Sequence, residues 1–384
     1  MRKIFEMVGI IIVGILGIIV VVAILFINLN PRFGKGLSKA QKKEYATLEN
    51  FHNGKFVNLK SGSMKMNYRK LFKELKKKSP NTKPTKNILI EKIDSIDIEN
   101  YSRSVTHVVW FGHSTFLLII DGKKILLDPM LSEKPSPISL LGTSRFSNEL
   151  PISSEKLPFI DIVVLSHDHY DHLDYESILK LKNKVGQFIT PLGLANHLVK
   201  WGVDKNRIIE LNWWENIEYE NIKLTCTPAR HFSGRSIFDR QTSLWCSWAI
   251  EGKNEKLFFS GDGGYDAHFK EIGEKLGPFD IALMECGQYN TNWKHMHMMP
   301  EETAQASIDL KSKLVLPIHW GGFSLAFHHW TEPIERLLRK AKELNLCVTT
   351  PKIGEPVILG TPSFPAEKWW INFTEKDNNK QKQN

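Results

Sequence analysis

Residues 166–172 read Ser-His-Asp-His-Tyr-Asp-His, an H-x-H-x-D-H pattern rich in side chains that bind metal ions. Alternate residues of an extended segment point the same way, so His167 and His169 can converge on one ion. The adjacent pair Asp171 and His172 then turns toward a second ion. A histidine-rich surface loop is the alternative, but ligand-type residues at this spacing favour two metal sites that share one loop.

The pattern lies between a predicted strand and a predicted helix. Residues 160–165 are Ile-Asp-Ile-Val-Val-Leu, which is typical of a buried strand, and a helix is indicated from Asp174. Three more candidate ligands, His231, Asp262 and His319, each follow a β-like run. A rigid strand can aim such a side chain out of a sheet. A catalytic zinc site also keeps a position for water, whereas a structural site is closed by four protein ligands.

Strand and helix patterns alternate through the rest of the chain. We expect strands at residues 105–120, 124–127, 160–165, 217–225, 244–250, 256–260, 281–284 and 314–317. We expect helices at residues 174–182, 192–201, 266–276, 300–310 and 332–344. Mixed sheets covered by helices predict an α/β fold, a four-layer αββα sandwich with the ligands gathered along one edge.

These motifs occur in the order found in the metallo-β-lactamase superfamily, which the chain resembles over about residues 105–360. The opening motifs are Val-Val-Trp-Phe-Gly-His-Ser-Thr-Phe at 108–116 and Leu-Leu-Asp-Pro at 126–129. Within the superfamily the chain is most similar to N-acylphosphatidylethanolamine-hydrolysing phospholipase D and its bacterial relatives. That narrower likeness is carried by residues 244–248, 261–265, 276–280, 300–304 and 319–323.

The resemblance implies a ligand set for two zinc ions. One ion would be held by His167, His169 and His231, the other by Asp171, His172 and His319, with Asp262 bridging both. β-Lactamases of this fold have a cysteine at the position of Asp262, so antibiotic hydrolysis is disfavoured. Nucleases of the superfamily often carry a large inserted domain between the last two ligands. The short interval from Asp262 to His319 leaves no room for one, so we expect no nucleic-acid partner.

Two metal ions about 3.5–4 Å apart can share a bridging water, lower its pKa to about 7 and stabilise both oxygens of an in-line displacement. We therefore expect a di-zinc phosphodiesterase of phospholipase D type, acting on a phospholipid or small diester through a centre that includes Asp171 and Asp262. A lactonase or other carbonyl-ester hydrolase and a non-enzymatic zinc-binding membrane protein stay open. Other divalent metals suit the same donors.

Three further residues are candidates near this centre. His297 lies just before Pro300, which suits the first turn of a helix, and the resembled branch has an active-site histidine there. We expect it to contact phosphate or to donate a proton to the leaving group, with a structural histidine as the alternative. His113 is expected to hydrogen-bond near the metals rather than to ligate. Asp128 is expected either to hydrogen-bond the imidazole of a ligand histidine or to form part of a turn.

The N-terminal segment is apolar. Residues 7–27 contain no charged side chain, and about 20 apolar residues are enough to span a bilayer. We expect a single-pass membrane anchor; a cleaved signal peptide is the alternative, although no small-x-small cleavage pattern follows. Arg2 and Lys3 on one flank, and lysines and an arginine within 32–43 on the other, leave the side of the catalytic domain open.

The expected organisation is an anchor at 1–30, a basic linker and lead-in at 31–100, the hydrolase domain at 101–365 and a polar tail at 366–384. The basic stretch 68–78 can lie on anionic lipid or form a solvated helix. The net charge of +9 is compatible with a membrane-lipid partner without selecting one. The four cysteines have no disulfide-like spacing, and the oligomeric state stays open.

Overall fold

The computed structural model describes residues 2–60, 69, 73, 76, 81–138 and 142–374. Two large sheets face each other in this part of the chain. The first contains, in spatial order, β15 (Pro356–Ile358), β3 (His107–Trp110), β4 (Phe116–Ile120), β5 (Lys123–Leu127), β6 (Ile160–Val164), β7 (Val185–Pro191) and β8 (Ile208–Leu211). The second contains β14 (Val315–Ile318), β13 (Ile281–Glu285), β12 (Lys256–Phe259), β11 (Cys246–Glu251), β10 (Ile222–Pro228) and β9 (Asn216–Tyr219).

The central strands are buried on both faces because both faces of each sheet are covered. In β4, Phe116, Leu118 and Ile120 belong to the core between the two sheets. The alternate residues Leu117 and Ile119 belong to a second core on the outer face. This period of two along a continuous apolar run is the expected pattern for a strand buried on both sides.

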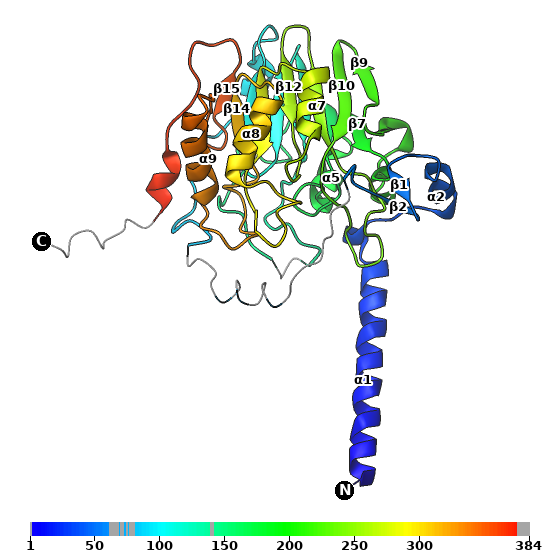
Figure 1. Ribbon diagram of the computed structural model, residues 1–384. Coiled ribbons are helices and arrows are strands. Elements are labelled where there is room, and N and C mark those ends of the chain that lie inside the picture. The colour runs from blue at the N-terminus through cyan, green and yellow to red at the C-terminus, as the bar shows by residue number, and fades with distance from the viewer. Residues whose placement is uncertain are drawn as a thin grey trace, which may run out of the picture.

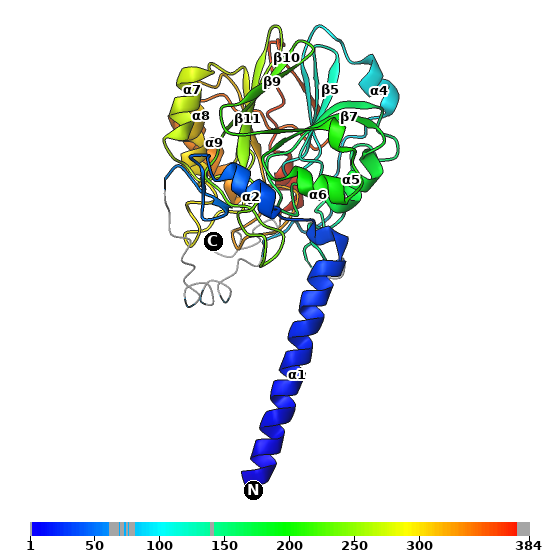
Figure 2. The ribbon, with the colours of Figure 1, turned by 90° about the vertical axis from the view of Figure 1, so that its right-hand side faces the viewer.

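Helices form the two outer layers (Figure 2). Ile98 of α4, Ile178 of α5 and Leu198 of α6 pack on the outer face of the seven-stranded sheet. Phe269 of α7 and Ala306 of α8 pack on the outer face of the six-stranded sheet. The predicted four-layer αββα sandwich is thus confirmed, with helices α4 (Ser95–Asn100), α5 (Tyr175–Leu181), α6 (Ala195–Lys200), η2 (Lys205–Arg207), α7 (His268–Lys275), α8 (Pro300–Asp309) and α9 (Glu332–Glu343).

Because many of the strands pair in parallel, the loops that carry the polar residues lie at the same edge of the sheets. Strands β5 to β8 pair in parallel, and so do β12 to β14. Carboxyl ends of parallel strands meet at the same edge of a sheet, where ligands bind in open α/β sheets. Asp128 follows β5, the loop 166–172 follows β6, Asp262 follows β12 and His319 follows β14.

Two of the expected strands are wrong in extent. Residues 105–120 form β3 and β4, and residues 217–225 span β9 and the start of β10, in each case as an antiparallel pair. The turns lie at residues with positive φ, 54° at His113 and 53° at Glu220. Because apolar residues flank each turn, the sequence pattern predicts one longer strand in place of two.

The N-terminal helix α1 (Arg2–Leu29) projects away from the domain (Figure 1). Its segment Ile4–Leu29 contains an 18-residue stretch with a mean hydropathy of 3.6, and no residue of that stretch is buried. As predicted, this helix is long and apolar enough to cross a membrane.

Parts of the segments expected as linker and tail are folded onto the domain instead. After η1 (Pro31–Phe33) come α2 (Lys39–Tyr45), β1 (Phe51–His52) and β2 (Lys55–Phe56), and their aromatic side chains enter the central core. Near the other end, η3 (Trp369–Phe373) buries Trp369 and Trp370. Burial of these aromatic side chains holds both segments on the domain. The basic stretch at 68–78 falls largely, and the tail from 375 wholly, outside the described residues, and the domain boundaries stay a prediction.

Candidate metal centre

Four predicted ligands form a first cluster. His169 Nδ1 lies 2.9 Å from His167 Nε2 and 3.2 Å from His231 Nε2. Asp262 Oδ2 lies 3.8 Å from His167 Nε2 and 3.9 Å from His231 Nε2. Because each residue offers one ligand atom and all four atoms lie within 4.8 Å of one another, the cluster could hold one metal ion. Three imidazoles and a carboxylate suit a divalent transition metal.

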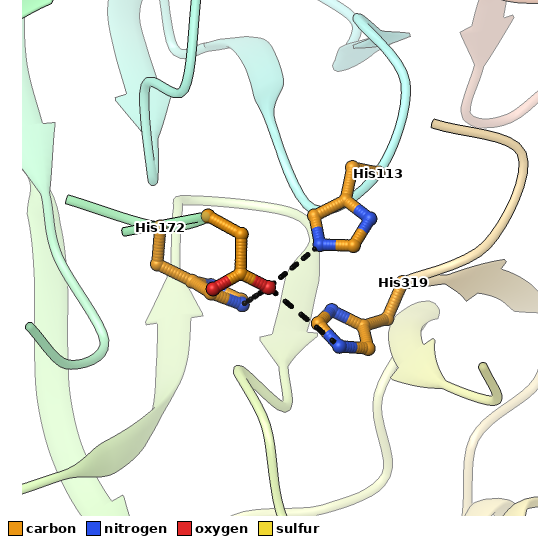
Figure 3. A group of neighbouring side chains, drawn as sticks. His113, His172 and His319 are labelled. Atoms are coloured by element: carbon orange, nitrogen blue, oxygen red, sulfur yellow. Dashed lines mark hydrogen bonds and ion pairs between the residues drawn. The ribbon is translucent and has the colours of Figure 1, made fainter. Parts of the chain in front are cut away.

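A second cluster lies beside the first. Figure 3 shows His113, His172 and His319 converging from different loops. The carboxylate at their centre is Asp171, whose Oδ2 lies 2.9 Å from His113 Nε2, 3.7 Å from His172 Nε2 and 3.9 Å from His319 Nε2. These four residues form a second group that could hold an ion. The structure therefore brings His113, expected only as a neighbour, into the same group as the predicted ligands.

Asp262 lies between the clusters. Its Oδ2 faces the first, whereas its Oδ1 lies 3.1 Å from His172 Nε2 and 3.1 Å from His319 Nδ1. All seven predicted ligands are thus close together, with one carboxylate directed at both groups. Asp262 lies where a carboxylate could reach both groups, and its bridging role stays a prediction.

The protonation of three ligand histidines fits cations, whereas Asp262 and Asp171 outweigh burial at His172 and raise its pKa. His172 Nε2 and Asp262 Oδ1 are buried 3.1 Å apart but make no hydrogen bond, so a cation would compensate the buried carboxylate oxygen. Burial lowers the pKa of His167, His231 and His319 well below the usual value and so favours the neutral imidazole that binds metal. Burial also raises the pKa of Asp262 to about 6, a cost that a neighbouring cation would offset.

A buried carboxylate supports the ligands from behind. Asp128 accepts hydrogen bonds from His172 Nδ1 at 2.6 Å, from the Ser166 backbone nitrogen at 2.7 Å and from Ser166 Oγ at 2.5 Å. Ser166 Oγ in turn contacts His167 Nδ1 at 2.9 Å. Such contacts fix which ring nitrogen faces the metal. Of the two roles expected for Asp128, the imidazole contact is present.

His297 lies next to both clusters and contacts a residue that the sequence analysis missed. Its Nδ1 hydrogen-bonds Glu285 Oε1, and its ring centroid lies 5.1 Å from that of His231. Glu285 is completely buried, which raises the pKa of its carboxyl well above the usual value, and it accepts a hydrogen bond from the Gly263 backbone nitrogen at 2.9 Å. The sequence does contain a signal for Glu285, because it is an acidic residue at the end of the otherwise apolar strand β13.

A cavity of about 340 Å³ opens over the clusters. His169, Asp171, Asp262 and His319 line it together with His297. The remaining wall includes residues that sequence reasoning did not single out for this role: Phe232, Arg240, Gln288, Trp293, Met296 and Leu325. The cavity thus combines the ligand side chains with aromatic and aliphatic ones, as small-molecule sites do.

The chain is similar in sequence and in fold to known proteins. Residues 123–320 match the family described as the beta-lactamase superfamily domain. An uncharacterized protein of Mycobacterium tuberculosis is 40% identical over 331 residues, which cover 84% of this chain and 87% of that protein. N-acyl-phosphatidylethanolamine-hydrolyzing phospholipase D 1 of Caenorhabditis elegans is 35% identical over 250 residues, covering 62% of this chain and 70% of that protein.

The fold also matches solved structures. A metallo hydrolase from Ignicoccus hospitalis superposes with a TM-score of 0.51 at 22% identity, covering 67% of this chain and 99% of that chain. Archaeal relatives in sequence are named metal-dependent hydrolases. On these matches, and with the clustered histidines and aspartates described above, the chain belongs to the beta-lactamase superfamily and is one of its metal-dependent hydrolases.

Proposed function

We propose that the protein is a membrane-anchored phosphodiesterase of phospholipase D type that uses two zinc ions and acts on a phospholipid or related diester. The observation that carries the proposal is the position of Asp262, whose two oxygens face separate ligand clusters under one cavity. The likeness to an N-acyl-phosphatidylethanolamine-hydrolyzing phospholipase D supports the substrate class. α1 supports a single-pass anchor.

The ligand residues of the proposal are those brought together by the fold. One ion would be held by His167, His169 and His231 and the other by Asp171, His172 and His319, with Asp262 between them. Two such ions supply, when bound, a water of lowered pKa and positive charge for the diester oxygens.

The protein's own side chains supply orientation and proton transfer. Because His297 Nδ1 is engaged by Glu285, its Nε2 is the nitrogen that remains to hold or deliver a proton at the leaving oxygen. Arg240 lies on the cavity wall over the ring of Phe232, with its guanidinium carbon 5.4 Å from the ring centroid. A guanidinium at this position suits a phosphate group.

The test uses the full chain, loaded with zinc and incorporated into vesicles that contain N-acylphosphatidylethanolamine. Mass spectrometry should detect phosphatidic acid together with the free N-acylethanolamine. Asp262→Ala should release neither product, whereas Asp280→Asn, at the start of β13 and away from the ligand edge, should behave like the unaltered protein. Intact lipid with zinc bound, accompanied by turnover of lactones, would replace the proposal with a carbonyl-ester hydrolase.

A further inference from the structure

Two large apolar side chains are exposed at the tip of the loop between β10 and β11. Ile237 is 80% exposed and Phe238 is 60% exposed. The loop is nevertheless tied together beneath them, because Asp239 Oδ1 accepts hydrogen bonds from the backbone nitrogens of Arg235 and Ser236 and from Ser236 Oγ, at 2.7–3.1 Å. A held loop that presents adjacent apolar side chains is a feature of surfaces that contact a partner.

The tip lies beside the carboxyl end of α1. Phe238 and Ser236 line a hollow of about 300 Å³ whose opposite side is formed by Ile27 and Asn28 of α1 and by Phe33. Ile27 is within the last turn of the apolar helix, which ends at Leu29. A bilayer that surrounds α1 up to its last turn therefore reaches the level of the loop tip.

The end of α1 is fixed to the domain, so the loop and the helix keep their relative positions. Trp201 Nε1 donates to the Pro31 carbonyl at 2.7 Å, and Arg235 Nε donates to the Arg32 carbonyl at 2.8 Å. Arg32 also forms an ion pair with Glu176 at 2.6 Å. Arg235 belongs to the same loop, which makes this loop part of the joint between α1 and the domain.

The base of the loop belongs to the catalytic cavity. Phe232 and Arg240, on the two sides of the tip, line the chamber over the metal clusters. Near the tip, Lys35, Lys42 and Lys200 line the hollow beside α1. Lysines close to an anionic lipid surface strengthen its binding. The loop thus connects a basic, apolar surface at the end of α1 with the wall of the cavity.

We propose that Ile237 and Phe238 insert into the bilayer surface beside α1, so that the cavity opens at the lipid headgroups and takes its substrate from the membrane. The occupant of this apolar surface is a lipid bilayer; a second copy of the chain is the competing occupant. The membrane contact is inferred from the exposed loop tip and its position beside α1. The entry of substrate from the membrane rests, in addition, on the proposed function.

A spin label locates the loop directly. The full chain is placed in vesicles of phosphatidylcholine and phosphatidylglycerol, with a nitroxide on Phe238→Cys in a Cys347→Ser background, because the other three cysteines are buried. Phe159→Cys is the matched control, since Phe159 is 56% exposed and precedes β6 at the end opposite the ligand loop. The label at 238 should be more accessible to oxygen than to a water-soluble nickel complex, and the label at 159 the reverse.

Two results would overturn the membrane contact. Equal accessibility of the labels at 238 and 159 to the nickel complex would place the loop in water. Dipolar broadening between labels at 238 would show that a second copy covers the apolar pair.

Turnover separates this inference from the proposed function. Phe238→Ser should lower hydrolysis of vesicle lipid about tenfold, the loss expected when one buried aromatic side chain no longer holds the cavity at the lipid surface. Hydrolysis of water-soluble bis(p-nitrophenyl) phosphate should stay within about twofold of the value for Phe159→Ser. A parallel loss on both substrates would make the loop merely structural. If the unaltered protein hydrolysed neither substrate, the proposed function would be wrong. The spin-label measurement would still decide whether the loop contacts the membrane.

Discussion

Asp128 accepts a hydrogen bond from Nδ1 of His172 at 2.6 Å, and both side chains are fully inaccessible to solvent. The contact leaves His172 Nε2 directed at Asp262 and Asp171, at 3.1 and 3.7 Å. The same carboxylate reaches His167 through Ser166. One residue behind the loop therefore orients an imidazole of each cluster, and its removal should be felt as a loss of metal binding.

Asp128→Asn should weaken metal binding about 10- to 100-fold, the usual effect of losing a carboxylate that orients a ligand histidine. Titration against a chromogenic chelator measures the affinity. Asp280→Asn is the control. Asp280 also accepts a hydrogen bond from a backbone nitrogen, that of Lys256 at 2.8 Å, but it precedes β13 at the end of the strand away from the metal ligands. Equal affinities in the two variants would contradict the orienting role.

Asp262→Ala should reduce binding of both ions, because the two oxygens of Asp262 face different clusters. His231→Ala should mainly reduce binding of one ion, since His231 belongs to the first cluster. Native mass spectrometry of each variant under increasing chelator gives the ions held per chain. Retention of a complete pair of ions by Asp262→Ala, at the chelator concentration that empties one site of His231→Ala, would rule out a bridging carboxylate.

Local patterns in the sequence predicted much of this architecture. The apolar strand before residue 166 and the H-x-H-x-D-H spacing place four ligands within one loop, and the remaining ligands follow strands whose apolar runs are plain in the sequence. The predicted helices all have a counterpart in the structure. Such features depend on neighbours within a few residues, and for that reason a single sequence reveals them.

The features that the sequence did not reveal depend on contacts between distant segments. Glu285 meets His297 only because β13 ends beside the loop before α8. His113 reaches Asp171 across 58 positions of sequence. Phe51 and Phe56 read as part of a basic linker, yet they enter the central core because the folded domain offers them an apolar surface. Tertiary packing, rather than local preference, decides each of these positions.

Glu285→Gln should lower diester hydrolysis about 100-fold while metal content stays at the level of the unaltered protein, because the carboxyl group of Glu285 fixes the ring of His297 and lies outside the predicted ligand set. Steady-state rates and metal analysis check the two parts. The double variant Glu285→Gln/His297→Ala should be no slower than His297→Ala alone, because both changes remove the same function, that of the His297 side chain. Multiplicative losses would show that Glu285 acts apart from His297.

Arg235→Lys tests whether the joint with α1 also supports the metal loop. The buried guanidinium donates to the carbonyls of Asp168 and Leu173, each at 2.7 Å, and to that of Arg32 at 2.8 Å. Its carbon lies 4.0 Å from the ring centroid of Tyr170. A lysine ammonium cannot reproduce this planar fork, so unfolding free energy should fall by about 2–4 kcal/mol and metal affinity should fall with it.

Arg207→Lys provides the comparison for that prediction. Arg207 also donates to two carbonyls, those of Lys182 and Val185 at 2.8 Å, but these carbonyls lie away from the ligand loop. Denaturation and chelator titration of the full chain in detergent should show a loss of stability in both variants and a loss of metal affinity in Arg235→Lys alone. If both variants kept the metal equally well, the contacts that dock α1 would be independent of the ligand loop, even though one guanidinium touches both.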